Sequence, residues 1–232
     1  MSLPAAGYPR LLALGDAAFT VEFGDGIAPE THARVLGFAA ALDTLVEDGR
    51  LPGLVERVPT FRSVTVHFDP DRADSGVLGE TLLALAGEGR RATASGRLWT
   101  LPVCFDDDLA PDLADVAARA GLTREAVIAL LTATEFSVYM LGFLPGFPYL
   151  GGLPAALEMP RLATPRSRVP AGSVAIAGRM CAVYPWHSPG GWRLVGRTGA
   201  RLFDATQAAR PALLAPGDRV RWQAVGREAL GE

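Results

Sequence analysis

Residues 173–198 read SVAIAGRMCAVYPWHSPGGWRLVGRT. Three short apolar runs in this stretch are separated by turns rich in Gly and Pro: Ser173–Ala177, Cys181–Tyr184 and Trp192–Arg197. Runs of the same character lie on either side of it, at Phe136–Phe143 and Arg219–Ala224. Many short strands with dense turns predict a β-barrel or sandwich for the second part of the chain.

This β-rich region is preceded by a strand and two helices. The sequence predicts a strand at Leu98–Phe105 and a helix at Pro111–Ala120 that Gly121 ends. Thr123 is expected to cap the next helix, with Ala126 at its third helical position.

The first part of the chain mixes helices and strands. Leu11–Phe23 is expected to form a strand, a turn and a second strand, and Leu54–Phe68 returns to a strand pattern. Apolar residues recur at three- and four-residue steps in Pro29–Glu47, which predicts an amphipathic helix, and Val77–Leu85 is a second helix. This order predicts a small α+β sandwich with its helices on one face of a sheet.

The polar stretch Gly87–Gly96, which reads GEGRRATASG, has no periodicity and is the best candidate linker. We therefore expect a domain boundary near Ala94, with a small α/β sandwich domain in residues 1–93 and a β-barrel domain in residues 94–232.

Charge and composition exclude several functions. The net charge of −3 disfavours a sequence-independent nucleic-acid binder. All 22 basic residues are Arg, so a Schiff-base or phosphate-binding Lys is excluded. Any anion held by a side-chain cation must be held by Arg.

Cys104 and Cys181 show no metal-type spacing, and a reduced, cytoplasmic protein is expected. The uncharged stretch Phe136–Leu157 is long enough for a membrane span, but its Pro and Gly content argues against one. We expect it to be a strand entering a loop. His32 and His67 lie far from any Cys, so no metal site is expected, and the run Asp106–Asp108 is expected to be a solvated turn.

Three clusters could carry chemistry. Gly142–Gly152 places aromatic rings between Gly and Pro, which suits either a binding loop or packing at the end of a barrel. Thr164–Ser173 carries Arg166 and Arg168 two residues apart on extended chain, where both could grip one anion or form surface salt bridges. Tyr184–Trp192 offers Gly-Gly beside Ser and aromatic rings, a possible anion nest. His187 next to Ser188 does not form a catalytic triad, because neighbouring side chains rarely face each other.

These clusters resemble one family. The runs GFLPGFPYLGGL (142–153), TPRSRVPAGSVAIAG (164–178) and YPWHSPGGWRLVGRT (184–198) are similar to the KipI/PxpB family, the B subunits of bacterial 5-oxoprolinase, often labelled allophanate hydrolase subunit 1. The similarity extends to VTVHFDP (64–70) and PGDRV (216–220), so it covers nearly the whole chain. It implies a small N-terminal α/β domain followed by a cyclophilin-like β-barrel.

The resemblance also implies an activity. Together with a C subunit and an A subunit, such a chain supports the ATP-dependent opening of 5-oxoproline to glutamate, with Mg accompanying the ATP. Relatives suggest two alternatives: a KipI-like inhibitor of a sensor histidine kinase, or half of a biotin-dependent urea carboxyltransferase. We expect the isolated chain to be inactive, because the sequence identifies no catalytic base or nucleophile.

The residues that the resemblance and the clusters nominate for binding substrate or phosphate share Arg, Gly, hydroxyl or aromatic character: Gly146, Phe147, Tyr149, Arg166, Arg168, His187, Ser188, Gly190, Gly191, Trp192 and Arg197. The sequence departs from the family pattern at Met180-Cys181-Ala182, where Gln-Thr-Gly is usual, and at His187, where an acid is common.

Overall fold

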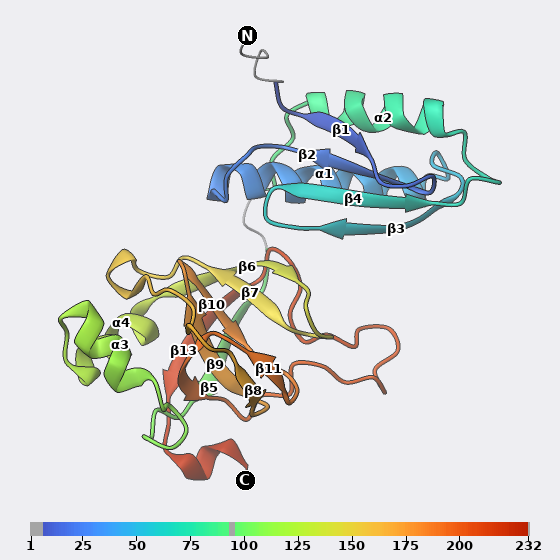
Figure 1. Ribbon diagram of the computed structural model, residues 1–232. Coiled ribbons are helices and arrows are strands. Elements are labelled where there is room, and N and C mark those ends of the chain that lie inside the picture. Colours follow the sequence, from blue (N-terminus) through green and yellow to red (C-terminus); the bar gives the residue numbers. More distant parts are fainter. Residues whose placement is uncertain (1–6, 93–95, 232) are drawn as a thin grey trace. The chain divides into compact units, whose positions relative to one another are not determined.

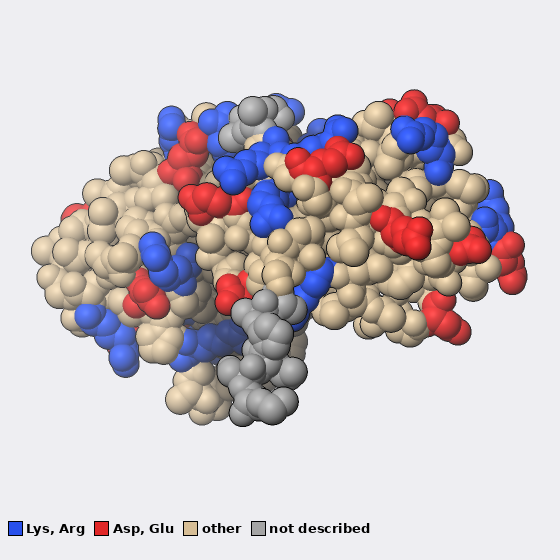
Figure 2. Space-filling model, turned by 90° about the horizontal axis from the view of Figure 1, so that it is seen from above, with Lys and Arg blue, Asp and Glu red and all other residues tan. Residues whose placement is uncertain are grey.

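The computed structural model describes residues 7–92 and 96–231, which form two compact units on either side of residue 95 (Figure 1). The boundary expected near Ala94 falls on residues 93–95, outside the described residues. Acidic and basic side chains are interspersed on the surface that Figure 2 shows. No helix among residues 7–92 and 96–231 is long and apolar enough to cross a membrane.

The first unit is an antiparallel sheet in the order β1-β2-β4-β3 with two helices. Its elements in chain order are β1 (Arg10–Ala13), β2 (Ala18–Glu22), α1 (Pro29–Glu47), β3 (Leu54–Pro59), β4 (Ser63–Phe68) and α2 (Ser75–Gly87). Both helices pack against the same core as Val64, Val66 and Phe68, which alternate along β4. The Asp74 side chain caps α2 by accepting a hydrogen bond from the Val77 N–H at 3.0 Å.

The second unit contains a seven-stranded mixed sheet that curls into a half-barrel, with a few helices (Figure 1). Its first elements are β5 (Leu98–Val103), α3 (Leu113–Ala120), α4 (Arg124–Ala133), β6 (Glu135–Leu141), β7 (Pro148–Gly151) and the 3-10 helix η1 (Ala155–Leu157). They are followed by β8 (Arg166–Val169), β9 (Ser173–Ala177), β10 (Met180–Val183), β11 (Ser188–Gly190), β12 (Arg193–Arg197), β13 (Arg219–Ala224) and the 3-10 helix η2 (Arg227–Leu230). The strand order is β12-β9-β10-β7-β6-β13-β5, and β8 pairs with β11 separately.

The two edge strands of the large sheet meet where β5 and β12 end. Cys104 and Arg197 exchange two backbone hydrogen bonds, of 2.8 and 2.9 Å, although β5 and β12 stand at opposite ends of the strand order. Gly196 allows this approach, because a Cβ there would lie 2.7 Å from Cγ1 of Val103. The curl of the sheet is therefore closed at one point.

Most predicted elements are present, and the differences have physical causes. The helix expected from Pro111 begins at Leu113, and the backbone N–H of Asp112 before it bonds to the Leu194 carbonyl at 3.0 Å. Thr123 caps α4 through Ala126, as predicted. Strands β7 and β11 lie where the sequence predicted loops, because Gly and Pro within them hide the strand pattern.

A buried carboxylate fastens the start of the second unit. Asp218, 5% exposed, accepts hydrogen bonds from the Arg97 N–H at 2.9 Å, the Trp99 indole N–H at 2.9 Å and the Ala215 N–H at 3.0 Å. Gly96 is packed so closely here that a Cβ would lie 1.9 Å from the Gly217 carbonyl oxygen. Asp218 thus joins the beginning of β5 to the turn before β13.

Replacing Asp218 with Ala should destabilise the second unit by about 2–4 kcal/mol, because three donors lose a charged acceptor. All four Trp residues lie in this unit, at positions 99, 186, 192 and 222, so denaturant unfolding followed by Trp fluorescence measures it alone. The exposed Glu158→Ala variant is the control and should change the free energy of unfolding by less than about 0.5 kcal/mol. Equal effects of the two variants would contradict the role given to Asp218.

Candidate functional site

The site begins with a difference in side-chain size between the two faces of β9 and β10. On one face, Val174, Ile176 and Val183 pack into the main core of the second unit. On the other face, the side chains are those of Ala175, Ala177 and Ala182. Methyl groups leave room above the sheet, and rings fill it.

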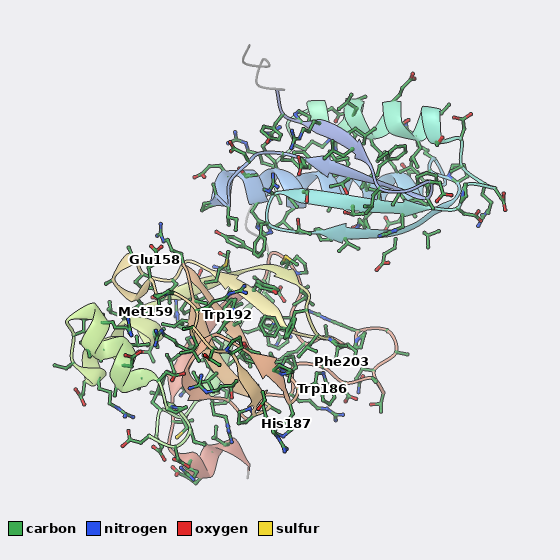
Figure 3. The ribbon with its side chains drawn as sticks, in the orientation of Figure 1. Glu158, Met159, Trp186, His187, Trp192 and Phe203 are labelled. Atoms are coloured by element: carbon green, nitrogen blue, oxygen red, sulfur yellow. The ribbon has the colours of Figure 1, made fainter. Side chains whose placement is uncertain are left out.

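We call Phe147, Tyr149, Tyr184 and Trp192 the aromatic layer. Ring centroids are 5.1 Å apart for Phe147 and Tyr149, 5.1 Å for Phe147 and Tyr184, and 6.0 Å for Tyr149 and Trp192. These distances and the tilted or edge-on planes are those of favourable aromatic pairs. The layer joins residues from the first and third sequence clusters, on β7, at the end of β10 and directly before β12. Figure 3 shows Trp192 within the second unit.

The Gly/Pro loop before β7 leaves more aromatic surface exposed. Phe143 is 61% exposed and has a φ of 70°, a conformation that costs energy for a bulky residue. Its ring contacts Phe147 at 5.3 Å and Tyr184 at 6.4 Å. Trp186 is 45% exposed, donates its indole N–H to the Pro145 carbonyl at 3.2 Å and lies beside Phe203 (Figure 3).

Gly146 and Gly190 are glycines because other residues approach too closely for a side chain. A Cβ on Gly190 would lie 2.4 Å from the Tyr184 hydroxyl oxygen. Gly146 has a φ of +77°, and a Cβ there would lie 2.7 Å from Cβ of Phe203. At Gly191, by contrast, an added Cβ would make only ordinary contacts, the shortest with Cγ of Pro165 at 3.6 Å.

Arg166 already has a carboxylate partner. Its Nη2 donates to Oδ1 of Asp112 at 2.7 Å, and Oδ2 of Asp112 accepts from the Leu194 N–H at 2.7 Å. Asp112 is 8% exposed, so this carboxylate fixes β8 and β12 to the start of α3 from inside the structure. The grip of Arg166 and Arg168 on one anion stays a prediction, with Arg166 largely neutralised by Asp112.

The other nominated residues lie in different surroundings. Gly190 pairs with Arg166 and Ser188 with Val169, so β11 brings the second and third clusters together. Arg168 and His187 are exposed, while the Ser188 hydroxyl donates to the Pro189 carbonyl, so Ser188 and His187 form no pair. Arg197 lies at the sheet closure beside Cys104.

The sequence did not identify Asp112 and Arg193 as the buried charged residues that join the segments around the site. Asp112 lies near the start of the helix predicted at Pro111–Ala120, and nothing local in the sequence indicates its partners on β8 and β12. Arg193, 5% exposed, ion-pairs with Asp115 and donates from Nε to the Pro160 carbonyl at 3.2 Å. These contacts join segments that are far apart in sequence, so only the tertiary structure reveals them.

The departure from the family pattern at Met180-Cys181-Ala182 is mainly a matter of packing. Cys181 points into the main core and Ala182 contributes to the alanine face under the aromatic layer. Met180 packs beside the layer and is partly buried. Of the three positions, only Met180 is partly exposed on the side of the candidate site.

The two tyrosine hydroxyls of the layer and the Cys181 thiol stay protonated. Burial raises the pKa of the Tyr149 and Tyr184 hydroxyls above its ordinary value, so both remain protonated donors at neutral pH. Burial raises the pKa of the Cys181 thiol to about 12. A protonated, buried thiol is a poor nucleophile. The aromatic layer therefore brings no activated nucleophile.

The acidic turn at Asp106–Asp108 is exposed, as predicted for a solvated turn, and its carboxylates pair with arginines. Arg227 ion-pairs with Asp106 and Asp108, and Arg124 ion-pairs with Asp107. Within the part of the chain that the structure describes, no group of three or more His, Cys, Asp or Glu side chains could hold a metal ion.

Comparisons with known proteins give the site a context. A family model described as "Carboxyltransferase domain, subdomain C and D" matches residues 9–214. The chain is 38% identical to the B subunit of 5-oxoprolinase from Bacillus subtilis, over 90% of each chain. It is 40% identical to the solved protein TTHA0988, with a TM-score of 0.77 over 90% of this chain, and it spans only 40% of that chain. The Kluyveromyces lactis urea carboxylase shares the fold at 23% identity, with a TM-score of 0.74 over 99% of this chain and 24% of that one.

A Gly190→Ala substitution should disturb the aromatic layer, because its methyl group collides with the Tyr184 hydroxyl. We expect a loss of about 1–3 kcal/mol of unfolding free energy in Trp-fluorescence denaturation. Gly191→Ala is the matched control and should cost less than about 1 kcal/mol, because its methyl group has ordinary contacts. A Gly190→Ala protein as stable as the control would mean that Tyr184 is not packed against β11.

Cys181 should resist alkylation in the folded protein. The rise of its pKa from 9.0 to about 12 lowers its thiolate fraction at pH 8 about 1000-fold, and burial blocks access as well. We expect mass spectrometry to find the peptide carrying Cys181 unmodified after iodoacetamide treatment of the native protein. The same peptide should be fully modified after unfolding in guanidinium. Rapid native labelling would show that Cys181 is accessible and reactive.

Proposed function

The chain belongs to the family of the carboxyltransferase domain, subdomain C and D, which includes the B subunits of 5-oxoprolinase, and we propose that it is the B subunit of an ATP-dependent 5-oxoprolinase. In this proposal it acts with a C subunit and an A subunit to open 5-oxo-L-proline to L-glutamate. The similarity to the Bacillus subtilis protein runs along 90% of both chains, so it includes both structural units.

The observation that carries the proposal is that the first and third sequence clusters form the aromatic layer, while β8 of the second cluster pairs with β11 of the third. The substrate is a small, flat, cyclic amide with one carboxylate. Tyr149, the partly exposed ring of the layer, offers a surface for a flat ring, and its protonated hydroxyl is a donor for polar oxygens. In this proposal, Phe143, held exposed in a strained conformation beside Tyr184, extends this surface.

Opening the lactam adds water across its C–N bond, and this needs a group that activates water or the carbonyl. In the described residues of the aromatic layer, the candidate groups are two neutral Tyr hydroxyls, and the buried Cys181 lies beneath them. Neither kind of group is suited to activate water at neutral pH. We therefore place the activating groups on a partner subunit, and the chain alone should be inactive.

The helix N-termini of this chain support placing ATP elsewhere in the complex. Each of the four α-helices that the structure describes carries a carboxylate at the N-cap or in the first turn: Glu30 in α1, Asp74 in α2, Asp112 and Asp115 in α3, and Glu125 in α4. Helix N-termini that could attract phosphate thus already hold negative charge. We place ATP and its Mg on a partner subunit of the complex.

Two further assignments belong to the proposal. The curled sheet of the second unit is assigned to the cyclophilin-like class, supported by its closure at Cys104 and Arg197. A cytoplasmic location is supported by two buried cysteines that form no disulfide.

Purified subunits, mixed in all combinations, test this function directly. We expect 5-oxoproline-dependent release of phosphate and glutamate only when the chain is combined with its C and A subunits. Omitting this chain should abolish turnover, because its aromatic layer forms part of the site.

The mixture is also assayed with urea and a carboxybiotin donor, and with the autophosphorylating sensor kinase of the same cell. Turnover of urea without turnover of 5-oxoproline would favour the carboxyltransferase alternative. Kinase inhibition without turnover of 5-oxoproline would favour the regulatory alternative. Either result would reject the proposed activity.

A further inference from the structure

Arg161 sits on a segment whose backbone is held from both sides. The Pro160 carbonyl accepts a hydrogen bond from Nε of the buried Arg193 at 3.2 Å. The Leu162 N–H donates to the Gly191 carbonyl at 2.7 Å. Arg161, between these two anchors, is therefore kept next to Gly191 although its own side chain is exposed.

The segment Gly190–Trp192 connects Arg161 to the aromatic layer. The Gly190 backbone lies close to the Tyr184 hydroxyl. The Gly191 carbonyl accepts the hydrogen bond from Leu162, and the Trp192 ring contacts the Tyr149 ring. In agreement with this placement, the positive charge of Arg161 opposes the rise that burial causes in the pKa of both Tyr149 and Tyr184. The guanidinium thus lies at the edge of the layer.

Arg161 differs from the neighbouring arginines in having no carboxylate partner among the described residues. Arg166 is paired with Asp112, and Arg193 is paired with Asp115. Among the described residues, Arg161 has neither an ion pair nor a hydrogen-bonded carboxylate. Arg168, also exposed, lies beside Val169, at the end of β8 away from the pairing of Arg166 with Gly190. The edge of the layer next to Gly191 therefore carries one uncompensated positive charge.

We propose that Arg161 binds the carboxylate of the substrate while the lactam ring lies against Tyr149. This inference rests on the proposed function and names the residue that recognises the acid group of 5-oxoproline. One uncompensated guanidinium matches one carboxylate, which it can bind through two parallel N–H donors. A nucleotide phosphate chain carries several negative charges and would be poorly neutralised here.

Binding to the full-length chain, alone and in the assembled complex, is measured by ligand-observed NMR with 5-oxoproline and with its neutral analogue 5-oxoprolinamide. Arg161→Ala should raise the Kd for 5-oxoproline about 10- to 100-fold, because a charged hydrogen bond is lost. Arg161→Lys keeps the charge without the fork and should have a smaller effect. The neutral amide should bind weakly, and its Kd should be the same for the wild type and for Arg161→Ala.

Arg179→Ala is the matched control, since Arg179 is an exposed arginine in the turn between β9 and β10. Removing its charge should change the Kd less than about 2-fold. Trp-fluorescence unfolding confirms that the Arg161 variants are folded.

The outcomes separate this inference from the proposed reaction. The role of Arg161 would be overturned if Arg161→Ala bound 5-oxoproline as tightly as the wild type does, or if the substitution weakened binding of the acid and the amide equally. It would also be overturned if the wild type bound no 5-oxoproline, either alone or in the complex. Turnover by the complete complex in those cases would leave the proposed activity intact. Conversely, Arg161-dependent binding of the acid without turnover in any mixture would support the carboxylate site and reject the reaction.

Discussion

The unequal side chains on the two faces of β9 and β10 are the constraint on which the site depends. Val174, Ile176, Cys181 and Val183 of these strands face the main core, whereas Ala175, Ala177 and Ala182 face the aromatic layer. Larger residues in place of Ala175 or Ala182 would occupy the volume of Phe147 and Tyr184. The layer can therefore form only because the alternation of the strands places small residues on one side.

Two buried carboxylates connect the segments around this layer to one another. Asp112 links α3, β8 and β12, and Asp218 links the start of β5 to the turn before β13. The hydrogen bonds that several donors make to a buried carboxylate are strong, because solvent does not compete for its oxygens. The ion pair with Asp112 neutralises Arg166. In the proposed site, the positive charge that binds the ligand therefore comes from a residue at the edge of the layer.

The chemistry of the second unit suits a shared active site. In the proposed function the partly exposed Tyr149 ring holds the flat substrate, whereas the thiol of this unit is buried and its helix N-termini are already acidic. In the proposed assembly, this chain supplies recognition and a partner supplies activation. The relation to longer relatives is in keeping with this division, because the chain spans 40% of TTHA0988.

The sequence by itself determined the strands and helices with clear periodicity, the absence of Lys chemistry and the family, because these depend on local patterns and long motifs. It also nominated the aromatic and glycine-rich clusters. The tertiary structure alone decided that Asp112 neutralises Arg166, that Cys181 faces the core, and that Arg161 stands beside Gly191. Those facts arise from contacts between residues that are 29 to 82 positions apart or from the direction of a strand face, and no local pattern encodes them.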